Sequence, residues 1–222
     1  MEDTIYNRTE IILGKDNVDK LKTKHIMICG IGGVGSYCLE ALSRIGVGIF
    51  TIIDKDRVDI TNVNRQIIAT MDTIGEDKVN IAKKRVELIN KEAKVTALKL
   101  NLTKDNIEEI LKDKSIDYVV DCVDNIEAKL AIILQCNKKN IKCISSMGMG
   151  NRLNPLDIKI DDIYNTKICP LARIMRKRLK EEGIKKQKVV YSVELPKKKT
   201  DEEQNYIQIL LAVFPLFLLL LV

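Results

Sequence analysis

Short apolar runs alternate with amphipathic stretches between residues 25 and 150, and this alternation constrains the fold more than any other feature. The apolar runs HIMICGI, IFTIID, KVTALKL, DYVVDCV and KCISSMGMG are rich in valine and isoleucine, which is typical of strands. The stretches between them, such as GVGSYCLEALSRIG and NIEAKLAIILQCNKKN, have the spacing of helices. Strands that are apolar on both faces and alternate with helices indicate a parallel sheet covered on both sides. We therefore predict an α/β fold.

The chain of 222 residues is long enough for one α/β core with extensions, and we divide it into four parts. Residues 1–24 are expected to form an N-terminal helical arm, and residues 25–150 contain the sheet. Residues 151–195 start with an irregular link, NRLNPLDIKIDDIYN, and continue with a basic helix from Pro170 to Gly183 and a short strand, VVYSVE. We predict that this C-terminal segment flanks the sheet. Residues 196–222 are a charged linker and an apolar tail.

Charged residues of both signs are frequent, with 37 Lys and Arg against 31 Asp and Glu, so the formal net charge is +6. This surplus suits a polyanionic partner, although a lysine-rich solvated surface produces the same sum. The six cysteines are Cys29, Cys38, Cys122, Cys136, Cys143 and Cys169. No two form a CxxC pair and most lie in apolar runs, so we expect reduced cysteines in a cytoplasmic protein. The polar N-terminus, MEDTIYNRTE, lacks the pattern of a signal peptide.

The C-terminal tail, NYIQILLAVFPLFLLLLV, carries no charged side chain. From Ile207 to Val222 it has 16 residues, fewer than the roughly 20 that a membrane-spanning helix needs. Three interpretations remain open. The tail is a helix packed on the core or on a dimer partner, a peripheral membrane anchor, or the product of an altered reading frame.

A glycine-rich turn follows the first predicted strand, in the sequence HIMICGIGGVGS. Its glycines are Gly30, Gly32, Gly33 and Gly35, and a helix is predicted to begin at once. Glycines let the backbone turn tightly and approach a phosphate, and the helix N-terminus attracts the anion. Asp54 ends the next strand, where a carboxylate can bind ribose hydroxyls. The pattern predicts a Rossmann-like, mostly parallel sheet that binds a nucleotide, with NAD as the default and a turn that merely packs as the alternative.

A polar cluster follows the second strand and makes a dehydrogenase less plausible. Its members are Asp56, Asn62, Asn64, Arg65 and Gln66, with Lys78 on the next helix. Arginine and lysine are suited to a triphosphate, and asparagine can bind phosphate oxygens or metal-bound water. The only histidine, His25, starts the first strand and is expected to be structural, so the chain lacks a histidine proton donor for hydride transfer.

The sequence DCVDN places Asp121 and Asp124, followed by Asn125, at the C-terminal end of the fourth strand. Open α/β sheets bind ligands at this edge, and a carboxylate there can hold Mg²⁺ against phosphates. The alternative is that Arg65 and Lys78 are surface charges and that Asp124 caps the next helix.

Together, GIGGVGS, IDKDRVDITNVNRQ, GEDKV and DCVDN resemble the adenylating domain shared by ThiF, MoeB and the ubiquitin-activating enzymes, over residues 5 to about 150. The resemblance implies an enzyme that uses ATP and Mg²⁺ to activate a carboxylate. By the same resemblance, Gly32, Asp54 and Lys78 bind the nucleotide. Asn64 and Arg65 bind the phosphates, and Asp124 binds the metal. Arg8, in NRTEIILG, resembles an arginine that such homodimers contribute to the ATP site of the neighbouring subunit.

The cysteine pattern and the second half of the chain indicate the branch of the family. ThiF and MoeB hold zinc with two CxxC pairs, which are absent here, so we predict no zinc site. The segments SSMGMGNRLNP, DIYNTKICPLARIMRKRLKEEGI and VVYSVELP resemble the tRNA threonylcarbamoyladenosine dehydratases. This implies ATP-dependent activation of the threonyl carboxylate in the tRNA anticodon loop, followed by cyclisation with net loss of water. The sequence leaves open whether a sulfur-transfer or electron-carrying auxiliary protein takes part.

Basic residues in the second half are candidates for contacts with tRNA. Arg152 is placed to meet the substrate carboxylate or the RNA backbone, or is an ordinary charge of the link. The predicted basic helix carries Arg173, Arg176, Lys177, Arg178 and Lys180, and Lys185, Lys186 and Lys188 follow it. The alternative is a solvated amphipathic helix that buries Leu171, Ile174 and Leu179. Cys169 is either structural or a thioester or persulfide nucleophile.

Two other functions remain as alternatives. The first is an adenylyltransferase that activates the C-terminus of a ubiquitin-like sulfur carrier, disfavoured by the absent zinc motifs and the basic helix. The second is an NAD-binding or redox-sensing protein, disfavoured by the Asn-Arg-Gln cluster.

Overall fold

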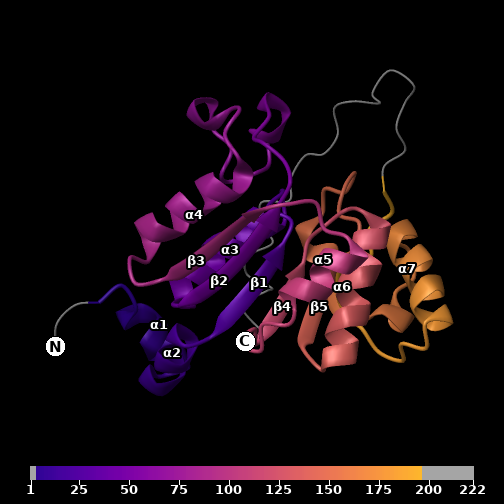
Figure 1. The fold of residues 1–222 in the computed structure, drawn as a ribbon. Helices are drawn as coiled ribbons and strands as arrows, with labels where there is room; N and C mark the ends of the chain where they lie inside the picture. Colours follow the sequence, from indigo (N-terminus) through magenta and orange to yellow (C-terminus); the bar gives the residue numbers. More distant parts are fainter. Residues whose placement is uncertain (1–3, 197–222) are drawn as a thin grey trace.

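The computed structural model describes residues 4–196 of the chain, and these contain one seven-stranded sheet (Figure 1). The strands are β1 (His25–Cys29), β2 (Ile49–Asp54), β3 (Lys94–Lys99), β4 (Tyr118–Asp121), β5 (Lys142–Ser146), β6 (Ile158–Asp162) and β7 (Lys188–Ser192). Their order is β3-β2-β1-β4-β5-β7-β6, and every neighbouring pair is parallel except β6 with β7. The predicted mostly parallel α/β fold is therefore confirmed.

Helices cover both faces of this sheet (Figure 1). They are α1 (Asn7–Leu13), α2 (Lys15–Lys22), α3 (Gly35–Ile45), α4 (Lys78–Ile89), α5 (Lys104–Ile110), α6 (Ile126–Lys139) and α7 (Pro170–Glu181). Four short 3₁₀ turns lie between them: η1 (Ile60–Asn62), η2 (Met71–Thr73), η3 (Pro155–Asp157) and η4 (Ile163–Asn165). Two of the helices, α1 and α2, lie within the predicted N-terminal arm.

Alternate residues of the central strands serve two separate cores. In β1, Ile28 packs in the cluster under α3 and α4, whereas Met27 packs in the cluster under α5 and α6. Both are completely buried, because strand side chains alternate between the two faces of a sheet. A third cluster joins α6 and α7 to β7 and to Met147, which directly follows β5. The continuous apolar runs of the sequence therefore arise from burial on both faces.

The structure corrects two expectations for residues 151–195. Within the link that we expected to be irregular, Ile158–Asp162 forms β6, which pairs antiparallel with β7 at the edge of the sheet. In α7 the buried residues are Ala172, Met175 and Leu179, whereas Ile174 is 45% exposed. Residues three or four apart share a helix face, so Ile174 cannot belong to the face that these three residues form.

The structure describes the chain only as far as residue 196, so the C-terminal linker and tail from Lys197 onward lie outside the described residues. The three interpretations of the tail therefore stay open. Within residues 4–196, no helix is both long enough and apolar enough to cross a membrane.

Candidate functional site

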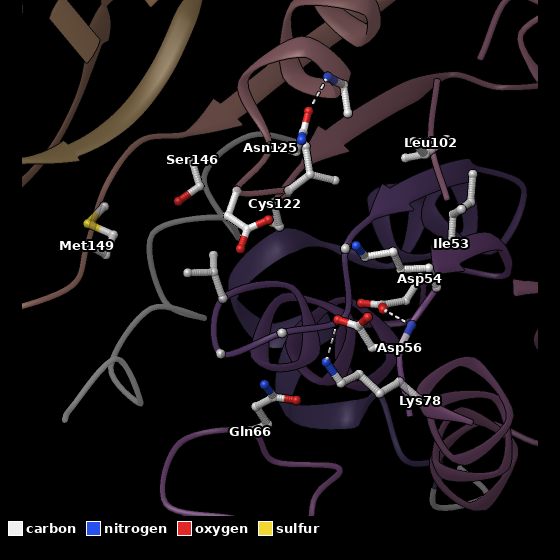
Figure 2. Close-up of a pocket in the computed structure, with 18 of the residues that line it drawn as sticks. Ile53, Asp54, Asp56, Gln66, Lys78, Leu102, Cys122, Asn125, Ser146 and Met149 are labelled. Atoms are coloured by element: carbon white, nitrogen blue, oxygen red, sulfur yellow. Dashed lines mark hydrogen bonds and ion pairs between the residues drawn. The ribbon is translucent and has the colours of Figure 1, made fainter. Parts of the chain in front are cut away.

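A cavity of about 440 Å³ lies at the C-terminal ends of the central strands (Figure 2). Its size falls in the range typical of small-molecule sites. It is lined by the turn after β1, the end of β2, the polar loop and the first residue of α4, and by the loops after β4 and β5. The predicted site residues among the lining are Gly30, Gly32, Gly33, Asp54, Asp56, Asn62, Arg65, Gln66, Lys78, Asp124 and Asn125.

The glycines of the turn are present for different structural reasons. Gly30 has φ +89°, and a Cβ there would lie 2.9 Å from the carbonyl oxygen of Cys122. At Gly35, a Cβ would lie 1.8 Å from the carbonyl oxygen of Gly30, so only glycine lets α3 start so close to β1. A Cβ at Gly32 would meet no atom within 4 Å, so this residue faces open space. Gly30 and Gly35 shape the turn, and Gly32 leaves room for a ligand.

Asp54 is held in place by two backbone amides. Its Oδ2 accepts a hydrogen bond from the N–H of Ile31 at 2.6 Å, and its Oδ1 accepts one from the N–H of Asp56 at 2.8 Å. Each carboxylate oxygen keeps further capacity to accept a hydrogen bond. The end of β2 thus presents a fixed acceptor beside the glycine turn, suitable for hydroxyl groups.

Lys78 is 6% exposed, although it carries a charge. Figure 2 shows its amine directed at Asp56, with Nζ 3.3 Å from Oδ2. The side chain of Asp56 is 53% exposed, so water weakens this pair. Because an ammonium has three donors, Lys78 retains the capacity to bind an anion in the cavity.

Arg65 reaches the cavity along the glycine turn, where its Cγ would lie 3.6 Å from a Cβ at Gly33. Its Nη1 donates to the carbonyl oxygen of Thr61 at 2.7 Å and to Oδ1 of Asn64 at 3.1 Å. Burial lowers the pKa of Arg65. Within residues 4–196, its other two guanidinium nitrogens make no hydrogen bond or ion pair. Asn64 does not line the cavity and instead orients Arg65.

Two further polar residues of this loop differ in what they leave unpaired. Gln66 is 5% exposed, and its Oε1 has no hydrogen-bond partner within residues 4–196. Figure 2 shows Gln66 at the margin of the cavity. Asn62 closes a capping box around η1, because its Oδ1 accepts from the N–H of Asp59 at 3.2 Å. Gln66 therefore offers an unused acceptor, whereas Asn62 shapes the loop.

The loop after β4 contains three polar residues in different environments. Asp124 is exposed and makes no hydrogen bond or ion pair within the described residues. Asn125 caps α6 by accepting a hydrogen bond from the N–H of Ala128 at 2.9 Å, so the alternative that Asp124 is the cap is wrong. Asp121 is completely buried and pairs with Lys129 at 2.8 Å, which the sequence analysis did not foresee. Only Asp124 presents a free carboxylate.

The family assignment follows from comparison with known proteins. The model of the ThiF family matches residues 6–168, which include every residue of the cavity described above except Leu171. The chain belongs to the ThiF family.

Individual relatives of this ThiF-family chain are tRNA-modifying enzymes by name. It is 43% identical over 192 residues to the tRNA threonylcarbamoyladenosine dehydratase of Bacillus subtilis. This match covers 86% of this chain and 75% of the relative. A solved structure of TcdA (CsdL) matches with TM-score 0.90 at 31% identity, over 96% of this chain and 89% of that one. The E. coli enzyme in complex with ATP matches with TM-score 0.87 at 31% identity, over 96% and 88%. The ThiF-family chain therefore has the fold of these enzymes.

Several predicted contact residues of the ThiF-family chain do not line the cavity. Arg152 is 6% exposed, and its guanidinium donates to the carbonyl oxygens of Glu194, Gly148 and Gly150. It therefore holds the loop after β5 against the end of β7, which favours a structural role in the link over the contact with RNA or substrate. Gly35, Asn64 and Arg8 are also absent from the cavity lining, and Arg8 lies exposed on α1.

The three arginines of α7 are used differently from one another. Nη1 of Arg176 donates to the carbonyl oxygen and the hydroxyl of Thr166 at 2.6 and 2.7 Å. Arg178 forms a bidentate pair with Glu127 at 2.8 and 3.1 Å. Arg173 is exposed and makes no such bond within the described residues. Among these three arginines, only Arg173 can meet an anion without breaking a bond within the described residues.

Cys169 directly precedes α7 and is 1% exposed. Its Sγ lies 3.8 Å from the carbonyl oxygen of Gly148, behind the loop after β5. A thiol in this position cannot attack a substrate in the cavity without movement of that loop. The geometry therefore favours the structural interpretation of Cys169.

Proposed function

We propose that this chain is an ATP-dependent tRNA threonylcarbamoyladenosine dehydratase. The observation that carries the proposal is the joint placement of Arg65, Lys78 and Asp124 around one cavity that begins at the glycine turn. Two cations and one free carboxylate suit a triphosphate with its metal, and no histidine lies there. The similarity to named dehydratases, one of them solved with ATP, supports the same activity.

The ATP site follows from the contacts already described. Asp54 would accept hydrogen bonds from the ribose hydroxyls, and the turn at Gly32 would leave space for the phosphates. Ile53, Leu102 and Val123 supply apolar lining for the base. Lys78 and Arg65 would neutralise charge on the phosphates, and Gln66 Oε1 would receive a donor from the nucleotide.

Mg²⁺ belongs to this proposal because one residue fits it. Within residues 4–196 no three His, Cys, Asp or Glu side chains gather as a metal site. Mg²⁺ bound with a nucleotide needs only one or two carboxylates, because phosphate oxygens and water complete its shell. The exposed, unpaired carboxylate of Asp124 meets that need, and Mg²⁺ there would neutralise phosphate charge. The absence of zinc stays a prediction.

The reaction needs positioning more than acid–base groups. An oxygen of the threonyl carboxylate attacks a phosphorus atom of ATP, and the bond from that phosphorus to its leaving phosphate breaks. An atom of the same nucleoside then attacks the activated carbonyl carbon and loses its proton, and the phosphorylated oxygen departs as AMP or as phosphate, according to which phosphorus of ATP was attacked. Arg65 and Lys78 stabilise charge in the first step, and the intramolecular geometry drives the second. The nucleoside loses the equivalent of one water molecule.

The tRNA would approach across α7. Leu171, in the first turn of α7, lines the cavity, so the exposed face of this helix continues from the cavity mouth. Arg173, Lys177 and Lys180 are exposed on the helix. Residues at this spacing lie on neighbouring positions of one face and can contact successive phosphates. Of the basic residues expected on this helix, the proposal keeps Arg173, Lys177 and Lys180 and leaves out Arg176 and Arg178, which are bonded internally.

A homodimer in which Arg8 of one subunit reaches the ATP of the other is also part of the proposal. Helix α1 buries none of its own side chains, and Ile11 and Ile12 on it are each 84% exposed. Such a surface suits burial against a second copy. Sedimentation at assay concentration tests this, and a monomeric active enzyme would contradict it.

The experiment that separates the candidate functions compares three substrates for ATP turnover. These are tRNA carrying threonylcarbamoyladenosine, the same tRNA without the modification, and a ubiquitin-like sulfur carrier with a free C-terminus. We expect rapid nucleotide release only with the first. Turnover with the carrier alone would replace the proposal by the adenylyltransferase, and NAD binding without ATP binding would indicate the redox alternative.

A further inference from the structure

A buried lysine ties together two loops that line the cavity. Lys129 on α6 and Asp121 at the end of β4 both have completely buried side chains, and Nζ lies 2.8 Å from Oδ2. The same Nζ donates to the carbonyl oxygen of Ser146, the last residue of β5, at 2.9 Å. The other carboxylate oxygen of Asp121 accepts the N–H of Val123 at 3.2 Å. One ammonium group therefore bonds to the ends of two neighbouring strands.

These bonds lie at the point where the backbone pairing between β4 and β5 ends. The register of β4 with β5 ends at the pair Asp121 with Ser145. Beyond it, the chain after β4 supplies Cys122 to Asn125 to the cavity, and the last residue of β5 with the chain after it supplies Ser146 to Gly150. The bridge through Lys129 takes over from the backbone ladder at this point. It fixes the distance between two walls of the cavity.

Stability alone does not account for a pair in this position. Removing two charges from water is costly, and well-packed apolar residues of similar volume often replace a buried pair without loss of stability. An apolar pair could fill the space but could not bond to the Ser146 carbonyl or the Val123 N–H. The distinctive consequence of the ionic pair is geometric.

We propose that Lys129 is a positioning residue. Through Asp121 and Ser146, it holds the loop after β4, which bears Asp124, at the distance from the loop after β5 that a nucleotide with Mg²⁺ requires. This inference rests on the proposed function. Lys129 touches no ligand itself. It acts through Val123, the residue that precedes Asp124 and whose N–H is fixed by the Asp121 carboxylate.

The test uses a variant in which both charges are removed together. Burial raises the pKa of Asp121, and the charge of Lys129 opposes this. Removing Lys129 alone would leave a buried carboxylate that takes up a proton or destabilises the protein, and the result would be ambiguous. The variant Asp121→Leu with Lys129→Met avoids this. The matched control is Lys138→Met on the same helix, which breaks the exposed pair with Glu108.

The first measurement is hydrogen exchange in the protein without nucleotide or metal. We expect faster exchange of amides in residues 122–125 and 146–150 of the double variant, with the central strands β1 and β2 unchanged. A variant that exchanges faster everywhere would show only a structural role and would overturn the proposal. Unchanged loops would overturn it too.

The second measurement is calorimetric titration with ATP, once with Mg²⁺ and once with EDTA. In the wild type and Lys138→Met we expect Mg²⁺ to tighten binding. In the double variant we expect that gain to fall at least about tenfold, while ATP binding in EDTA changes less than about twofold. An equal gain in all three proteins would contradict the role of Lys129. A wild type that does not bind ATP at all would instead refute the proposed function.

Discussion

At the scale of single residues, the amine of Lys78 is buried but pairs only with a carboxylate that is half exposed. Such an amine is a strong site for phosphate, because a charged hydrogen bond in a partly buried place contributes about 1.5–3 kcal/mol. We therefore predict that Lys78→Ala weakens ATP binding about tenfold or more, as measured by calorimetric titration. Lys84→Ala, an exposed lysine on the same helix, is the control and should bind like the wild type. Equal affinity in both variants would refute the phosphate contact.

His25 gives a prediction about pH at the opposite end of β1. Its ring nitrogens lie 2.8 Å from Oγ of Ser115 and 2.9 Å from Oγ1 of Thr51, and burial lowers its pKa below 6.5 despite Asp113 and Asp117. As the pH falls through 6.5, the unfolded chain therefore takes up a proton before the folded protein does. We expect the free energy of unfolding to fall there, by at most about 1.4 kcal/mol per pH unit.

The chain has no other histidine, so the comparison with His25→Gln is direct. Urea denaturation between pH 5.5 and 7.5 should give a flatter profile for the variant than for the wild type. The same slope in both proteins would show that His25 does not cause the pH dependence.

Residue patterns predicted the cavity better than they predicted the surroundings of basic residues. Asp54, Lys78 and Asp124 follow different strands, yet they meet because parallel strands end at one edge of the sheet. Arg152 and Arg176 looked equally available in the sequence. Their internal hydrogen bonds depend on carbonyl groups brought together only by the fold, such as that of Glu194 for Arg152 and that of Thr166 for Arg176. The one signal for Lys129 was a lysine inside the apolar stretch AKLAIIL, eight residues after Asp121.

At the scale of elements, α7 presents a basic face that is independent of the ATP contacts. We predict that Arg173→Glu with Lys177→Glu weakens tRNA binding at least tenfold and lowers its salt dependence by about two charges. ATP binding should not change. Fluorescence anisotropy with labelled tRNA at several salt concentrations measures both quantities.

The control places the same change of charge at the N-terminal ends of two inner strands, where Lys114, before β4, and Lys142, the first residue of β5, are exposed. Lys114→Glu with Lys142→Glu alters the net charge equally but should retain most of the affinity. If both double variants lose affinity equally, tRNA is attracted by overall charge and α7 is not its contact.

The elements that the sequence analysis predicted share one property, which is that their periodicity is local. The strands β1, β2, β4 and β5 are apolar on both faces, so their sequences identify them without knowledge of their neighbours. Strand β6 is only partly buried, and it exists because β7 returns beside it. An edge strand of this kind has no strong pattern of its own. That is why the link from Asn151 to Asn165 was expected to be irregular.

At the scale of the molecule, the two ends of the sheet differ in what they provide. The C-terminal ends of β1, β2, β4 and β5 form the cavity, whereas His25 anchors the other end of β1 away from it. The C-terminal segment adds β7 and β6 next to β5 in the sheet, and α7 packs beside α6 (Figure 1). We therefore propose that the first part of the chain binds and uses ATP and that the second part places the tRNA.

The most direct test of this account is the mass of the modified nucleoside after reaction. The protein is incubated with Mg²⁺ and tRNA bearing threonylcarbamoyladenosine, with and without ATP, and the digested tRNA is analysed by mass spectrometry. We predict that the nucleoside loses the mass of one water molecule only when ATP is present. An unchanged nucleoside mass, with a protein that is folded and binds ATP, would contradict the proposed function.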